Sequence, residues 1–296
     1  MNKKNKKKFR WGQLCLNIFF IIASSTYILP LILMLSISVS SESSITEFGY
    51  SFLPKELGFD GYKAVFNNPK QLLDSYKVTI FYSVVATFLS MLLESMAAYP
   101  LSRRNYKFKK SVTMYMFITM LFSGGMVPHY LLNTKYLHLD NTIWIYIIPG
   151  LVGAWNIFIM RTFFQGLPDG LVEAAKIDGA SEYLIFFRII IPLSTPVLAS
   201  LGFMYMMGKW NNWNTSMLYI RDNELYSLQY LLQRILREAE YLKTMAKEGM
   251  AVMGKEPPTE TLRYAMAVMA AGPMMVIFPF FQKYFAKGLT IGSVKG

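Results

Sequence analysis

Six long apolar runs constrain this chain more than any other feature of its sequence. A bilayer hydrocarbon core about 30 Å thick requires roughly 20 residues of helix, so uncharged runs of that length predict transmembrane spans. The composition agrees, because 53% of the residues are hydrophobic and only 16% are charged, a low charged share for a soluble domain. We therefore predict an all-α polytopic membrane protein with six transmembrane helices. The predicted spans are 14–38, 77–100, 112–132, 142–160, 190–218 and 262–282.

The basic residues predict how the chain is oriented in the membrane. They are dense in residues 1–13, before the first span, and in "SRRNYKFKK" (102–110), between the second and third spans. Cytoplasmic segments carry an excess of Lys and Arg, so both segments are expected in the cytoplasm, and six spans place the tail 283–296 there too. The outer loop 219–261 also carries basic residues, but long loops cross with little regard to charge. The net charge of +12 thus reflects orientation in the bilayer rather than nucleic-acid binding.

Residues that could carry chemistry are scarce. The sequence contains no phosphate-cradling G-x-x-x-x-G-K-[ST] loop, no H-E-x-x-H pair and no nucleophile elbow. His129 and His138 are distant in sequence from any carboxylate cluster, and we expect both on the outer surface. Within the spans, Glu94 is expected near Arg103 or Arg104 as a local ion pair, and Lys209 near the outer interface. We therefore expect no catalytic residue, metal site or bound cofactor in this chain.

The loop 161–191, between the fourth and fifth spans, is unusually polar for its surroundings. It contains "EAAKIDGASEYLIFFRIIIP", residues 173–192. Pro168 suits the first turn of a helix, Gly179 permits the turn that ends it, and Ser181 can cap a second helix. Two interpretations follow: a helix that simply lies at the membrane interface, or a docking element whose small residues allow a partner to approach closely.

The spacing of this loop resembles the cytoplasmic signature of the permease subunits of bacterial ABC importers. Here the signature reads Glu173-Ala174-Ala175, then Asp178-Gly179-Ala180, and ends at Pro192. Flanking segments, including "FSGGMVPHYLL" (122–132) and the terminal "KGLTIGSVKG", are similar to carbohydrate-uptake permeases related to the smaller maltose permease subunit, especially their oligosaccharide branch. The resemblance covers about residues 75–296.

The resemblance implies a transport subunit of a bacterial cell membrane, with both termini cytoplasmic and no enzymatic activity of its own. Its expected partners are a second homologous permease, two ABC ATPases that hold ATP and Mg, and an extracellular sugar-binding lipoprotein. The loop would then act as a coupling helix seated in an ATPase cleft. Glu173 would pair with a basic residue of the ATPase, Ala174 and Ala175 would allow close contact, and Gly179 would make the turn.

Two other classes of protein remain as alternatives. An ion-coupled secondary transporter of a polar solute would typically need buried acids, broken helices or internal repeats, and few intramembrane charges are present. A membrane scaffold or sensor would need no coupling signature. The sequence does not identify which sugar an importer of this kind would carry.

The segment "GKWNNWNTSMLYI" (208–220) is the candidate substrate pathway. Amide groups in hydrocarbon are costly unless they face a partner or a wet cavity. The amides of Asn211, Asn212 and Asn214 suit sugar hydroxyl groups, and the rings of Trp210 and Trp213 suit sugar faces. The alternative is an interfacial aromatic belt with amides that pack between helices. Farther on, helix-like spacing in 228–242 predicts an amphipathic helix in the outer loop, which would contact the binding protein or cover the spans.

Overall fold

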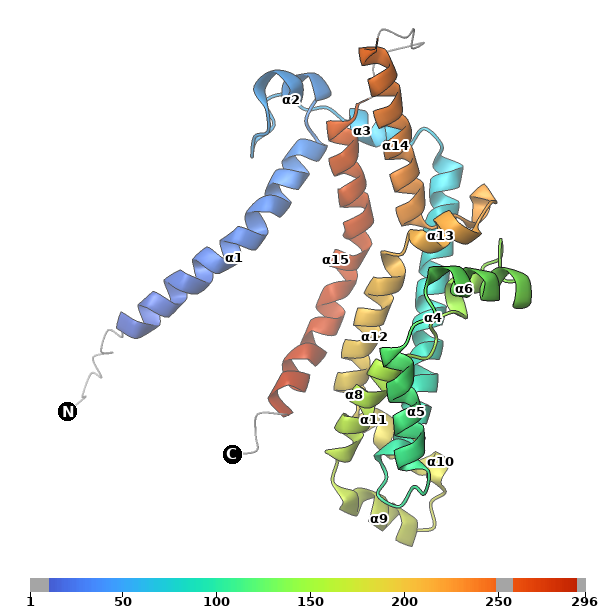
Figure 1. The fold of residues 1–296 in the computed structure, drawn as a ribbon. Helices are drawn as coiled ribbons and strands as arrows, with labels where there is room; N and C mark the ends of the chain where they lie inside the picture. Colours follow the sequence, from blue (N-terminus) through green and yellow to red (C-terminus); the bar gives the residue numbers. More distant parts are fainter. Residues whose placement is uncertain (1–10, 249–257, 292–296) are drawn as a thin grey trace, which may run out of the picture. The chain divides into compact units, whose positions relative to one another are not determined.

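The computed structural model describes residues 11–248 and 258–291, and every regular element in these ranges is a helix (Figure 1). The predictions for the basic residues 1–10, for part of the outer loop (249–257) and for the end of the tail (292–296) lie outside the described residues. The helices form two compact units. The first contains the chain up to Asn67 together with Ile235–Ala271, and the second contains Asn68–Arg234 and the chain from Gly272 onward.

The first unit contains a long apolar helix whose side chains are largely exposed. Helix α1 (Trp11–Ser38) has a mean hydropathy of 2.3 over its most apolar window, of which no residue is buried. A helix that is apolar on all sides requires lipid or other membrane helices around it. The short helices α2 (Glu42–Phe48) and α3 (Asp60–Val65) follow, and parts of α14 (Leu228–Lys247) and α15 (Glu260–Ile291) complete the unit.

Glu42 anchors the start of α15 within this first unit. Its carboxylate accepts hydrogen bonds from the backbone N–H groups of Thr259, Glu260 and Thr261 at 2.9–3.0 Å and from the Thr261 hydroxyl at 2.7 Å. These N–H groups have no partner within the helix. Burial opposes ionisation of Glu42, but the hydrogen bonds outweigh it and hold the pKa of the carboxyl below its ordinary value. The ionised carboxylate therefore stabilises this contact near neutral pH, and the stabilisation is lost as the pH falls through the lowered pKa.

The second unit is built around α4 (Pro69–Ser102), which packs against α8 (Ala154–Gln165) and α12 (Thr195–Trp210). Small buried side chains line its packed face, and such residues let membrane helices approach closely. They are Ser75, Thr79, Ser83, Ala86, Ser90, Ser95 and Ala98. The remaining elements are α5 (Lys109–Leu121), α6 (Met126–Leu131), a π-helical turn (Leu132–Tyr136), α7 (Trp144–Ile147), α9 (Asp169–Ile177), α10 (Glu182–Ile185), a second π-helical turn (Phe186–Ile190), α11 (Ile191–Leu193), α13 (Asn214–Tyr219) and a 3-10 turn (Asn223–Leu225).

Three predicted spans coincide with long continuous helices, and the others do not. Within the described chain, Gly12–Ser38, Pro69–Ser102 and Glu260–Tyr284 are long and apolar enough to cross a membrane. The predicted spans 112–132 and 190–218 correspond to helix pairs bent by 110° and 77° at short breaks. Counting each pair as one span raises the number to five.

The fourth predicted span, 142–160, is interrupted rather than continuous. Helix α7 ends at Ile147 and α8 begins at Ala154. Pro149 lacks a backbone N–H and Gly150 adopts a φ of +79°, a conformation that L side chains rarely take and that stops a helix. The physical cause of the break is thus local and lies in these two residues.

Candidate functional site

Helix α9, predicted as a docking segment, lies at one end of the second unit (Figure 1). Asp169 stands in its first turn, where a negative charge suits the positive end of the helix. Val172 is buried in a hydrophobic cluster that includes Tyr99. Leu171 and Ile177, by contrast, are 44% and 87% exposed. Apolar side chains left open on a polar loop are typical of a surface that contacts a partner.

The turn after α9 confirms the local prediction that Gly179 ends the helix. Gly179 has a φ of +76°, and its N–H donates to the carbonyl of Lys176 at 3.1 Å. The N–H of Ala180 donates to the carbonyl of Ala175 at 2.9 Å. This pair of bonds defines a Schellman motif, which favours glycine at its left-handed position. The Ser181 hydroxyl then caps α10, as its type and position predict.

The predicted coupling residues differ in their exposure. Exposed are Glu173, Ala174, Asp178 and Gly179, and half-buried are Ala175 and Ala180. Glu173 lines a pocket of about 740 Å³ together with Arg103 and Arg104 of the 102–110 loop. Among the described residues, Glu173 has no ion-pair partner within 4 Å. Its carboxylate is therefore open to a cation from another chain.

One polar contact joins the two helices of the α9–α10 hairpin, and two others attach the hairpin to the end of α4. Lys176 and Glu182 form an ion pair at 2.6 Å across the turn. The hydroxyl of Tyr99, near the end of α4, donates to Glu182 at 2.6 Å. Arg104, just beyond α4, pairs with Asp169 at 3.3 Å. These contacts link the hairpin to the end of α4.

The candidate pathway segment lies beside the bent third span. Asn211, Asn212, Trp213 and Asn214 line a pocket of about 330 Å³, to which α6 contributes His129. The Asn212 side chain also accepts the N–H of Thr215 at 3.0 Å. Trp210 does not line this pocket and is only 2% exposed. The structure thus brings four of the five predicted residues together and places Trp210 in the core, where its ring is not available to a substrate.

The prediction that Glu94 pairs with Arg103 or Arg104 is wrong. Glu94 is fully buried and accepts hydrogen bonds from the backbone N–H of Gly153 at 2.8 Å and from the Asn156 side chain at 3.0 and 3.2 Å. It therefore holds the N-cap residue of α8 and a side chain of its first turn, just after the break in the fourth predicted span. The partners lie about sixty positions away in sequence, which is why a local interpretation missed them.

Lys209 is held by backbone carbonyls of the second unit. Its Nζ donates to the carbonyls of Tyr146 at 2.6 Å and Pro149 at 3.2 Å, at the other side of the same break. The hydroxyl of Tyr205 donates to the carbonyl of Gly150 at 2.9 Å. An acid thus serves the N–H groups on one side of the break and a cation serves the carbonyls on the other, so an interrupted helix keeps its polar groups satisfied away from water.

Comparisons with known proteins agree with this arrangement. Residues 5–291 match the family described as "Binding-protein-dependent transport system inner membrane component". The chain is 38% identical to Protein LplC of Bacillus subtilis over 99% of its length and 97% of that protein. It is 35% identical to the polygalacturonan/rhamnogalacturonan transport system permease protein YtcP of the same organism, over 94% and 96% of the two chains. A crystal structure of a bacterial ABC transporter that imports the acidic polysaccharide alginate superposes with a TM-score of 0.78 at 27% identity, covering 96% of this chain and 100% of that chain.

The fold and the family match define a polytopic permease. The chain belongs to the inner membrane components of binding-protein-dependent transport systems. It is accordingly a transport subunit of an ABC importer rather than an enzyme. This assignment rules out the alternative of an ion-coupled secondary transporter. Within the described residues, no group of three or more His, Cys, Asp or Glu side chains is placed to hold a metal ion.

Proposed function

We propose that this chain is one of two nonidentical permeases of an oligosaccharide importer, and that α9 couples it to an ATPase. The exposed face of α9 carries this proposal, because an open carboxylate and open apolar side chains stand on a hairpin bonded to α4. The two ATPases would hold ATP and Mg, and their closure would move α9 and shift the spans between outward-open and inward-open states.

The proposed topology has six spans, with 112–132, 142–160 and 190–218 each crossing as an interrupted helix. Glu94 and Lys209, which satisfy polar groups beside the break in 142–160, support this count for the fourth span, because irregular backbone at membrane depth needs such partners. The basic residues of 102–110 support a cytoplasmic position for that loop, for α9 and for both termini. Residues 219–261, including the whole of α14, would then lie outside and face a sugar-binding lipoprotein.

The substrate is proposed to be an oligosaccharide. Relatives named for arabinooligosaccharides and for polygalacturonan and rhamnogalacturonan support a carbohydrate. The amides and the indole that line the pocket beside α6 support it independently, because they match the hydroxyl groups and ring faces of sugars. The pocket is open in part and small, so we propose that it touches only one end of the substrate while the second permease supplies further contacts.

Purification of the chain from its native membrane in mild detergent tests the assignment. A second permease and an ATPase with a phosphate-binding loop should accompany it, and sugar-loaded binding protein should stimulate ATP hydrolysis by the product. The proteins are identified by mass spectrometry, with a known membrane complex as a control for the detergent. Recovery of the chain alone, without ATPase activity, would contradict the proposal.

Asn214→Ala tests the pathway. The side chain is exposed and lines the pocket, so we expect intact assembly but a KM for uptake raised by about fivefold, the effect of one hydrogen bond. The measurement is sugar uptake into vesicles that contain the whole transporter. Asn67→Ala, which removes an exposed amide that does not line this pocket, should leave the KM unchanged. Equal KM values in wild type and Asn214→Ala would remove Asn214 from the pathway.

A further inference from the structure

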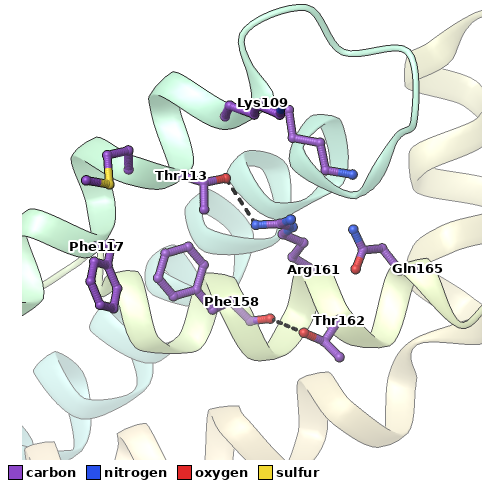
Figure 2. A pocket seen from close by; sticks show the side chains of 9 residues that line it. Lys109, Thr113, Phe117, Phe158, Arg161, Thr162 and Gln165 are labelled. Atoms are coloured by element: carbon purple, nitrogen blue, oxygen red, sulfur yellow. Dashed lines mark hydrogen bonds between the residues drawn. The ribbon is translucent and has the colours of Figure 1, made fainter.

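A third pocket lies between α5 and α8, away from the residues that the proposed function uses (Figure 2). Its volume is about 700 Å³. The lining residues are Lys109, Lys110, Thr113, Met114, Phe117, Phe158, Arg161, Thr162 and Gln165. Three of these side chains are cationic and none is acidic, although an acid is the usual neighbour of clustered cations inside a protein.

The three cationic side chains of this pocket make few hydrogen bonds or ion pairs with described residues. Arg161 donates from Nη1 to the hydroxyl of Thr113 at 3.0 Å, and its buried Nε has no hydrogen-bond partner among the described residues. Lys109 reaches a backbone carbonyl at a long 3.4 Å. Lys110 is exposed and has no ion pair with any described residue. The start of α5 adds the positive end of a helix dipole to the same place, so the pocket attracts an anion.

The other half of the pocket is apolar. Met114 and Phe117 of α5 and Phe158 of α8 form this part, and in Figure 2 the two phenyl rings lie to one side of Arg161. Helix α5 has no buried residue, and Met114 and Phe117 are exposed. At 1.5 Å per residue, Phe117 lies about 12 Å along the helix from Lys109. A ligand that fills both halves has an anionic head and a hydrocarbon tail.

We propose that this pocket binds an anionic phospholipid, with its phosphate at Lys110 and Arg161 and an acyl chain along Met114, Phe117 and Phe158. Basic pockets between membrane helices on the cytoplasmic side suit such headgroups. Both lysines belong to the basic segment 102–110, at the start of α5, so the headgroup level is the expected depth of the cationic half. A free anionic sugar would match the cations but would leave the apolar half without a partner.

Photolabelling of the purified transporter tests the lipid site. The probe is phosphatidylglycerol with a photoreactive group in its acyl chain, in phosphatidylcholine nanodiscs that hold the whole complex. The label is expected on the peptide that contains Met114 and Phe117. Unlabelled phosphatidylglycerol should displace the probe, whereas additional phosphatidylcholine and inorganic phosphate should not. Labelling should fall by about tenfold in Lys110→Gln and Arg161→Gln, since each loses a charge-assisted contact.

Lys107→Gln is the matched control, because it removes one exposed charge from the same loop without touching the pocket. Its labelling should equal that of the wild type. Lys110→Gln keeps the test decisive if Arg161→Gln fails to assemble, since Lys110 holds no other described group in place. Equal competition by phosphatidylcholine, displacement by inorganic phosphate alone, or equal labelling of Lys110→Gln and Lys107→Gln would each overturn the proposal.

Discussion

Gly179→Pro should strongly reduce sugar uptake while the transporter still assembles in the membrane. Proline fixes φ near −65° and lacks an N–H, whereas Gly179 has a φ of +76° and donates to the carbonyl of Lys176. The Schellman turn that ends α9 therefore cannot form, and the exposed face of the helix loses its fixed direction. We expect uptake to fall by about tenfold or more, because the strain costs on the order of 3 kcal/mol. Uptake and ATP hydrolysis are measured on the same vesicles.

Uncoupling, rather than loss of folding, is the specific expectation. Basal ATP hydrolysis should persist in Gly179→Pro, but sugar-loaded binding protein should no longer stimulate it. Gly170→Ala is the matched control, since Gly170 lies within α9, has no positive φ and has open space where a Cβ would stand. That variant should transport normally. Normal uptake by Gly179→Pro would show that α9 does not couple the ATPase to the spans.

A charge reversal on the same helix distinguishes loss of the partner contact from distortion of α9. Glu173 is exposed and holds no cation among the described residues, so Glu173→Lys should leave α9 in place and repel the proposed basic partner. It should therefore give the same uncoupled behaviour as Gly179→Pro, without a folding defect. Glu47→Lys makes an equal charge change on the exposed end of α2 and should have no effect on coupling.

Local rules explain which parts of this fold the sequence could predict. The turn at Gly179 and the cap at Ser181 follow from residue types within a few positions, and both are present. The long runs that became α1, α4 and α15 are likewise continuous apolar segments. Hydropathy averaged over a window conceals interruptions, so the break between α7 and α8 was missed although Pro149 and Gly150 mark it.

Contacts between distant positions were beyond a single sequence. Glu94 forms its hydrogen bonds with Gly153 and Asn156, and no residue near Glu94 in the sequence predicts these partners. The nearby Arg103 and Arg104 were the expected partners, yet the guanidinium of Arg103 stacks on Tyr99, 4.5 Å from the ring centroid. The burial of Trp210 is also determined by tertiary packing, because the neighbouring asparagines do not indicate whether the ring of Trp210 or that of Trp213 is buried.

Glu94→Leu should be the most damaging substitution inside the second unit. Leucine has a similar size but no acceptor, so the half-buried N–H of Gly153 and amide of Asn156 would lose the acceptor that they share. Each such group costs about 1–3 kcal/mol, so we expect roughly 3 kcal/mol of lost stability. The interrupted fourth span would then lack the group that holds the start of α8. The expected result is a thermal unfolding temperature of the purified complex lowered by several degrees and a reduced yield from the membrane.

Glu94→Gln distinguishes the hydrogen bonds from the charge. Glutamine keeps an acceptor oxygen for Gly153 and Asn156, so most of the stability should return if hydrogen bonding dominates. Lys209→Met provides the complementary test, because it removes the donor to the carbonyls of Tyr146 and Pro149 on the other side of the break. It should lower the unfolding temperature as well. If Glu94→Leu and the wild type unfold at the same temperature, the break does not depend on Glu94, and the backbone preferences of Pro149 and Gly150 alone must hold the interrupted span in place.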